Sequence, residues 1–147
     1  MQQRFDITTA SPERYKAMLA LHSAVGASGL EATVLELIRM RISQINGCAF
    51  CIAMHVEVAR KAGISDAQLH LLPAWREAPL YSDRERAALA WAEALTRLTD
   101  GDVADQVYDE VRRHFSIGEI ADLGFAVAEI NGWNRMMIAS RTPPALA

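Results

Sequence analysis

The chain has 147 residues, enough for one domain with a hydrophobic core, and its 51% content of hydrophobic residues excludes a disordered protein. Fifteen lysines and arginines stand against eighteen aspartates and glutamates, and the formal charge of −3 gives no reason to expect the basic face that binds nucleic acid. No lysine-rich amphipathic segment indicates a membrane surface, and no apolar stretch reaches the roughly 20 residues that a membrane-spanning helix needs.

The first third of the chain predicts two helices. Ser11 and Pro12 mark the start of the first, because serine is a favourable N-cap and proline fits the first turn, and we expect its end near Ala24. The second begins near Leu30 and ends at Gly47, since glycine readily adopts the left-handed conformation that follows many helices. One face of this second helix is apolar, with Leu30, Val34, Leu37, Ile38, Ile42 and Ile45 at helical spacing.

Two more helices are expected in the middle of the chain. One starts at or just before Cys48 and runs to about Lys61, and Gly63 follows its end. A shorter helix is expected over residues 65–72. Residues 75–81 are predicted to be a connector, because two prolines in this region interrupt helical structure.

The chain after residue 81 contains two capping boxes, in which a serine and a glutamate three residues later satisfy each other's backbone N–H groups. Ser82 begins one helix, which we expect to end at Asp100 and Gly101. Ser116 begins another, which runs to about Ser140. Between them, a further helix is indicated by Val103, Val107, Val111 and Phe115.

Strand-like alternation of polar and apolar residues is hard to find, so the patterns together predict an all-α fold. We expect a single-domain helical bundle of about seven helices that comprises residues 1–147, with its core over roughly residues 15–140. The last helix is apolar on more than one face, and such a helix must be buried on most sides, within one chain or against a partner chain. Its apolar residues are Ile117, Ile120, Leu123, Phe125, Val127, Ile130, Trp133, Met136, Met137 and Ile138.

The strongest chemical signal lies in residues 45–55. This stretch holds the only two cysteines, Cys48 and Cys51, and His55 follows four residues after the second. Two thiols this close can cycle between dithiol and disulfide, and a neighbouring imidazole can hold one of them as the reactive thiolate. In a helix the three side chains can share one face, and Cys48 lies near the helix start, where the macrodipole favours a thiolate.

Three other interpretations of the cysteine pair remain open on the residues alone. A structural zinc site needs four ligands, and besides the pair and His55 the chain offers only three scattered histidines, His22, His70 and His114. A structural disulfide across so few residues would contribute only roughly 2 kcal/mol, which suits reversible chemistry better than stability. The third interpretation is two ordinary buried cysteines with a half-buried, hydrogen-bonded histidine nearby.

The pattern extends to a carboxylate upstream. Glu36 is followed by eleven residues, Cys48, two residues, Cys51, three residues and His55. This spacing resembles that of the carboxymuconolactone decarboxylase superfamily, in its alkylhydroperoxidase D-like (AhpD-like) branch. Similar segments are residues 37–48, 59–63, 82–89 and 130–135. The resemblance implies an AhpD-like fold and a homo-oligomer, expected to be a trimer or a hexamer.

The resemblance also implies a thiol-dependent peroxidase that serves antioxidant defence. In its reaction Glu36 and His55 pass a proton and hold one cysteine as a thiolate, which attacks the hydroperoxide, and the other cysteine then closes a disulfide. The helix dipole favours Cys48 as the attacking thiol, but proximity to His55 and the family scheme favour Cys51. We predict Cys51 as the peroxidatic and Cys48 as the resolving cysteine. From the helical wheel alone Glu36 is a solvated carboxylate paired weakly with Arg39, so its role rests on the resemblance.

One position departs from the family pattern. Some members have a second histidine immediately before the second cysteine, and this position is Phe50 here, so a relay of two histidines is not expected. No flavin or nicotinamide fingerprint is present, so no cofactor or metal is predicted, and electrons are expected from an external thiol or dithiol reductant. The first six residues lack the apolar run of a signal peptide, which predicts the cytoplasm, where disulfides are usually transient.

Two other functions compete with the peroxidase. A non-enzymatic thiol–disulfide sensor or exchanger would use the same dithiol without saturable turnover of peroxide. Lactone decarboxylation, the reaction that names the superfamily, is less expected, because that branch generally lacks the cysteine pair.

Overall fold

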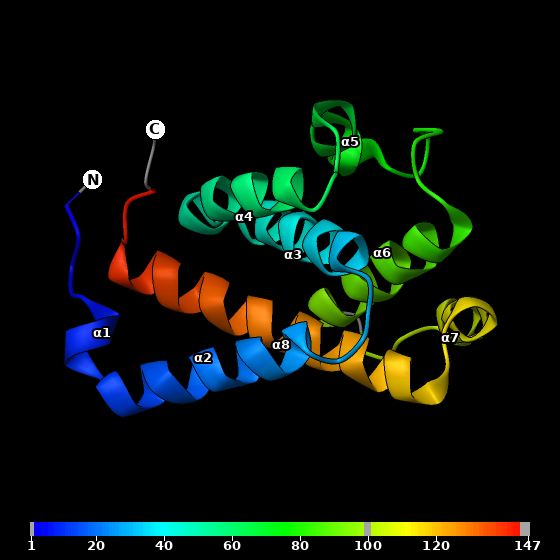
Figure 1. The fold of residues 1–147 in the computed structure, drawn as a ribbon. Coiled ribbons are helices and arrows are strands. Elements are labelled where there is room, and N and C mark those ends of the chain that lie inside the picture. The colour runs from blue at the N-terminus through cyan, green and yellow to red at the C-terminus, as the bar shows by residue number, and fades with distance from the viewer. Residues whose placement is uncertain (1, 99–100, 145–147) are drawn as a thin grey trace.

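The computed structural model describes residues 2–98 and 101–144, and these residues form helices and connecting loops without a strand (Figure 1). The helices are α1 (Ile7–Ala10), α2 (Pro12–Gly26), α3 (Ala32–Asn46), α4 (Ala49–Lys61), α5 (Asp66–Leu71), α6 (Asp83–Thr96), α7 (Asp105–His114) and α8 (Ile117–Ser140), with the short 3-10 helix η1 (Leu72–Ala74) after α5. The prediction of an all-α fold is confirmed. None of the described helices is long and apolar enough to cross a membrane.

The ends of several helices follow the capping signals of the sequence. The serines before α5, α6 and α8 each accept a hydrogen bond from the backbone three residues on, and the glutamine or glutamate at that position returns one. Gly47 closes α3 with a φ of 70°, in the left-handed region that favours glycine. This turn directs the chain straight into α4.

Two features differ from the prediction. The helix that begins after Ser82 ends at Thr96, before the end that was expected at Asp100 and Gly101. Asp100 lies outside the described residues. Arg97 already leaves the helical conformation, with a ψ of 53°. The additional helix α1 has only four residues, too few to show a periodicity in the sequence, and the Asp6 side chain caps it by accepting a hydrogen bond from the N–H of Thr8 at 2.8 Å.

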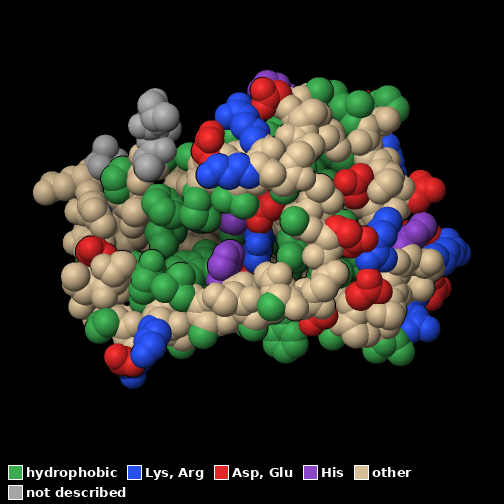
Figure 2. Space-filling view, viewed as in Figure 1, with side chains coloured by type: hydrophobic (Ala, Val, Ile, Leu, Met, Phe, Trp, Pro, Cys, Tyr) green, Lys and Arg blue, Asp and Glu red, His purple; other side chains and the backbone are tan. Residues whose placement is uncertain are grey.

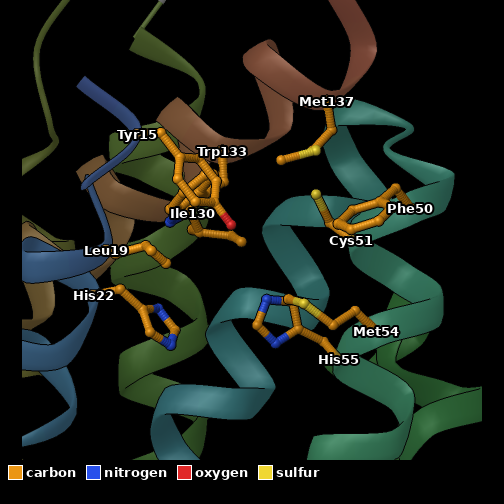
Figure 3. A pocket seen from close by; sticks show the side chains of 10 residues that line it. All are labelled: Tyr15, Leu19, His22, Phe50, Cys51, Met54, His55, Ile130, Trp133 and Met137. Atoms are coloured by element: carbon orange, nitrogen blue, oxygen red, sulfur yellow. The ribbon is translucent and has the colours of Figure 1, made fainter. Parts of the chain in front are cut away.

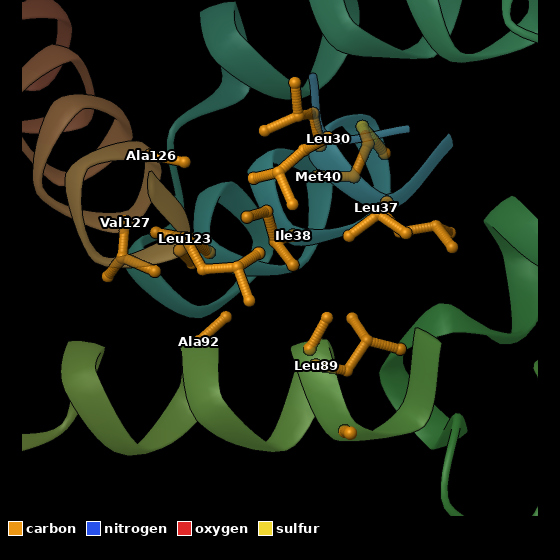
Figure 4. Packing of buried hydrophobic residues seen from close by; sticks show 14 of the residues in the cluster. Leu30, Leu37, Ile38, Met40, Leu89, Ala92, Leu123, Ala126 and Val127 are labelled. Carbon is orange, nitrogen blue, oxygen red and sulfur yellow. The ribbon is translucent and has the colours of Figure 1, made fainter. Parts of the chain in front are cut away.

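Helix α3 lies at the centre of the bundle and is buried on two faces. Its apolar stripe packs toward α6 and α8, and Figure 4 shows Leu37 and Ile38 gathered there with Leu89, Ala92, Leu123, Ala126 and Val127. The second buried face carries the polar side chains Glu36, Arg39 and Ser43. Buried polar groups need partners inside the protein, so this face determines where polar chemistry is placed.

Helices α4 and α2 lie on opposite sides of the carboxyl-terminal half of α8 (Figure 1). Gly132 permits the close approach of α2, because a Cβ at this position would lie 3.1 Å from Cε of Met18. The amino-terminal segment is fixed to the end of α8, where the N–H of Arg4 donates to the carbonyl of Ser140 at 2.8 Å. The candidate site lies between α2, α4 and α8.

Candidate active site

The two cysteines meet at the amino terminus of α4. Cys48 is the N-cap residue, and its Sγ accepts a hydrogen bond from the backbone N–H of Cys51 at 3.4 Å. Both residues are free thiols, and each is only 1% exposed. The pair is therefore shielded from bulk solvent, and the helix start supplies the polar partners of the first sulfur.

The environment separates the two thiols in acidity. The hydrogen bond from the Cys51 thiol lowers the pKa of Cys48 to about 7 against the opposing effect of burial, and the N–H groups of Cys51 and Phe50 and the side chain of Asn134 act in the same direction. Donation to Cys48, together with burial, raises the pKa of Cys51. The pair therefore loses its first proton near neutral pH, and the resulting negative charge is centred on Cys48.

His55 lies one turn after Cys51 on α4, and its Nδ1 is 2.7 Å from Oε2 of Glu36 on α3. The other carboxylate oxygen, Oε1, accepts a hydrogen bond from Arg39 at 2.8 Å. Burial would raise the pKa of Glu36, but the hydrogen bonds and charges of His55 and Arg39 outweigh it and hold this pKa below its ordinary value. The interpretation of Glu36 as a solvated carboxylate is wrong, because the residue is only 3% exposed and faces the interior beside His55.

The buried ion pairs continue past Arg39 to a second histidine. Nη2 of Arg39 donates to Oε2 of Glu129 on α8 at 3.1 Å, and Oε1 of Glu129 contacts Nδ1 of His22 on α2. Burial would raise the pKa of Glu129, but the contacts with His22 and Arg39 outweigh it and lower this pKa. A chain of five side chains thus joins four helices, from His22 to His55.

The sequence did not predict His22 or Glu129 at this site. A second imidazole does line the cavity, and it comes from His22 on α2 and not from the position of Phe50. One signal was available, since Glu129 interrupts the apolar residues 126–130, and a carboxylate in such a stretch requires a buried partner.

An apolar cavity of about 150 Å³ lies between α2, α4 and α8. Cys51 and His55 line it from α4, and His22 lines it from α2 (Figure 3). The other lining residues are Tyr15, Leu19, Phe50, Met54, Ile130, Trp133 and Met137. Figure 2 shows this face of the molecule hollowed, with hydrophobic side chains on the walls and histidine and arginine side chains at one end.

Helix α8 brings one polar side chain, Asn134, to the dithiol beside the apolar Met137. The amide of Asn134 donates to Oγ of Ser43 at 3.0 Å and accepts from Asn46 at 2.9 Å, which fixes this amide beside the cysteines.

Among the described residues, no three His, Cys, Asp or Glu side chains lie close enough together to hold a metal ion. The described residues therefore contain no set of ligands for the structural zinc site that the sequence left open.

The family of the chain follows from its match to known proteins. The model of the Carboxymuconolactone decarboxylase family matches residues 12–94, a range that contains Glu36, both cysteines and His55. This chain belongs to the carboxymuconolactone decarboxylase family. The uncharacterized protein YdfG of Bacillus subtilis strain 168 is 40% identical over 139 residues, which are 95% of each chain. The alkyl hydroperoxide reductase AhpD of Azorhizobium caulinodans is 40% identical over 47 residues, which are 32% of this chain and 26% of that protein.

Solved structures assign this family member to the AhpD-like branch. A protein of unknown function from Agrobacterium tumefaciens, proposed to be an antioxidant defence protein AhpD, matches with a TM-score of 0.96 at 40% identity and covers 99% of this chain and 100% of that chain. The debrominase Bmp8 matches with a TM-score of 0.83 at 20% identity over 93% of this chain and 74% of its own, a likeness of fold alone. The predicted resemblance to the AhpD-like branch is confirmed.

Proposed function

We propose that this member of the carboxymuconolactone decarboxylase family is a thiol-dependent peroxidase that reduces hydroperoxides through a dithiol–disulfide cycle. The proposal rests chiefly on one observation: Cys51 and His55 line the same apolar cavity, while Cys48 lies directly behind Cys51 at the start of α4. An attacking sulfur, a proton carrier and a resolving sulfur are thus adjacent, as a dithiol peroxidase requires.

The cycle begins when the dithiol gives one proton to His55, whose imidazolium is held by Glu36. When the remaining proton is on Cys48, the Cys51 thiolate attacks the terminal oxygen of ROOH. The S–O bond forms and the O–O bond breaks, so Cys51 becomes a sulfenic acid and RO⁻ leaves with a proton from the site as ROH. The Cys48 thiol then attacks the sulfenic sulfur, the disulfide forms, and hydroxide leaves with the Cys48 proton as water.

The lining of the cavity favours an organic hydroperoxide with a small apolar group over hydrogen peroxide. An apolar cavity of about 150 Å³ is large enough for a ligand of about the size of benzene. Burial of an apolar group contributes about 25 cal/mol per Å², and hydrogen peroxide has no such group. We therefore expect a lower KM for tert-butyl hydroperoxide than for hydrogen peroxide.

The proposed reductant reaches the disulfide from another side. Cys48 lines a second hollow of about 280 Å³, and Phe50 lies between this hollow and the substrate cavity as a wall of both. A thiolate that enters the second hollow meets the Cys48 sulfur, forms a mixed disulfide with it and releases the Cys51 thiolate. A second thiol then frees Cys48, so an external dithiol or two monothiols restore the enzyme.

Steady-state consumption of tert-butyl hydroperoxide with dithiothreitol as the reductant tests this proposal. We expect saturable turnover that is lost in Cys51→Ser and in Cys48→Ser. His70→Gln, an exchange of an exposed histidine on α5, is the matched control and keeps the activity. With a thiol–disulfide sensor or exchanger the rate would instead rise linearly with the peroxide concentration without saturation, and that result would contradict the peroxidase.

We also propose that the protein is a homo-oligomer, a trimer or a hexamer. Helix α8 exposes large apolar side chains at helical spacing, with Ile117 67% exposed, Phe125 58% and Met136 37%. Contiguous apolar patches of this kind are uncommon on monomers and mark interaction sites. Identical copies would cover the patch most simply in a closed symmetric assembly.

A further inference from the structure

His22 takes no part in the cycle described above, yet it lines the same cavity as Cys51. Figure 3 shows its ring on the wall formed by α2, facing His55 on α4. Nδ1 of His22 contacts Glu129, and Nε2 has no partner among the described residues. The His22 side chain is 40% exposed, whereas that of His55 is 3% exposed, so His22 exchanges protons with water more readily.

The carboxylates and the arginine of the buried cluster do not balance in charge. Glu36 and Glu129 contribute two negative charges and Arg39 one positive charge, and all three residues are buried. A net charge of −1 is costly in a medium of low dielectric constant. A proton delivered to the imidazole at either end of the chain, His22 or His55, balances this charge, so the cluster suits a histidine that takes up and gives a proton during the cycle.

The direction of the chemical step separates the roles of the two histidines. Attack of sulfur on a peroxide is an in-line displacement, so the leaving oxygen points away from the attacking sulfur. Cys51 and His55 lie on the same helix and share one wall of the cavity, whereas His22 belongs to the opposite wall. The leaving oxygen of a bound hydroperoxide is therefore directed toward the opposite wall, to which α2 contributes His22.

We propose that His22 is the general acid of the peroxidase cycle, an assignment that rests on the proposed function. Its Nε2–H gives a proton to RO⁻ as the O–O bond breaks, and ROH leaves while Cys51 becomes the sulfenic acid. His22 ends this step neutral and His55 keeps the proton that it took from the dithiol, so the buried cluster still holds one proton. Exchange with water then restores the proton on His22 and removes that on His55. Glu129 and Arg39 act through His22 as positioning residues.

The test compares two peroxides whose leaving groups differ in basicity. The alkoxide from tert-butyl hydroperoxide is a strong base and needs an acid, whereas the carboxylate from peracetic acid is a weak base and leaves without one. For His22→Gln we expect kcat/KM to fall about 100-fold or more with tert-butyl hydroperoxide and less than about 10-fold with peracetic acid. Glutamine keeps an N–H donor for Glu129, which protects the fold, and His22→Asn is a second variant of the same kind.

Alkylation of the dithiol by iodoacetamide provides the second measurement. Above pH 9, where thiols ionise without help from an imidazole, the rate of this reaction should be unchanged in His22→Gln, because His22 acts on the leaving group and not on the thiols. Equal losses of kcat/KM with both peroxides, or slower alkylation above pH 9, would overturn the acid role and leave the peroxidase standing. A wild-type protein that consumes neither peroxide would instead overturn the proposed function itself, and the acid role with it.

Discussion

Oε2 of Glu36 lies 2.7 Å from Nδ1 of His55, and this contact joins α3 to α4 in the interior of the bundle. The carboxylate fixes the orientation of the imidazole, because both side chains are buried and few other polar partners are within reach. Arg39, which donates to the same carboxylate, helps to keep it charged. Glu36 thus reaches the dithiol only through His55.

In the proposed cycle His55 takes a proton from the dithiol, so His55→Ala is expected to raise the pKa at which the dithiol loses its first proton toward the ordinary thiol value of about 8.5. The reason is that the variant lacks the proton acceptor beside Cys51. Glu36→Gln should raise this pKa less, since its effect is relayed. The rate of alkylation by iodoacetamide as a function of pH measures both changes. If both variants give the pH profile of the wild type, His55 and Glu36 do not activate the thiols.

The roles of the two cysteines are predicted from their surroundings. Cys51 lines the substrate cavity and Cys48 does not, so one equivalent of peroxide should give Cys48→Ser a stable sulfenic acid at Cys51, trapped by dimedone. The wild-type chain should instead lose two hydrogens as the intramolecular disulfide forms. Intact-mass spectrometry resolves these products. Sulfenic acid at Cys48 in Cys51→Ser, formed at the wild-type rate, would reverse the assignment.

The sequence predicted those parts of the site that depend on local spacing. Cys51 and His55 are four residues apart, so a helix alone brings them to one face. The two capping boxes predicted at Ser82 and Ser116 likewise are short-range patterns, and their helices begin where expected. Glu36 was predicted from the family resemblance. Leu35 and Met40 indicated that a second face of its helix could be buried, but they did not identify Glu36 as part of the site.

The remaining part of the site depends on contacts between distant segments. His22 and Glu129 are separated by 107 residues, and their contact requires α2 and α8 to cross at one place. No periodicity or cap encodes such a crossing, and a lone histidine in an exposed-looking helix carries no signal of its own. The short helix α1 was not predicted for a different reason, since four residues are too few for a periodic pattern.

Acid is expected to destabilise the fold, and Glu93 on α6 is a buried carboxylate that shows why. Burial would raise the pKa of Glu93, but hydrogen bonds from Arg76, Arg41 and Trp75 outweigh it and lower this pKa. The unfolded chain therefore binds the proton more readily, so the stability from this group is complete above the unfolded pKa of about 4.3 and is lost as the pH falls through the folded value.

Urea denaturation of Glu93→Gln at several pH values checks this prediction. At neutral pH the free energy of unfolding should fall by about 1.5–3 kcal/mol, because charge-assisted hydrogen bonds are weakened. The further loss on acidification should be smaller in the variant than in the wild type. Glu57→Gln, which alters an exposed ion pair with Arg60, is the control and should change the stability by less than about 1 kcal/mol. Equal acid dependence in the wild type and Glu93→Gln would contradict the assignment.

The exposed apolar face of α8 predicts the behaviour of the protein in solution. Light scattering after size exclusion should give three or six times the chain mass of 16.2 kDa at micromolar concentration. Phe125→Glu should shift this mass toward that of the monomer, because a carboxylate in an apolar interface is desolvated without a partner. Leu71→Glu changes an apolar side chain of similar exposure, 45%, on α5 and should leave the assembly intact. A wild-type mass near 16.2 kDa would refute the oligomer, and an intact assembly in Phe125→Glu would exclude this face of α8 as the interface.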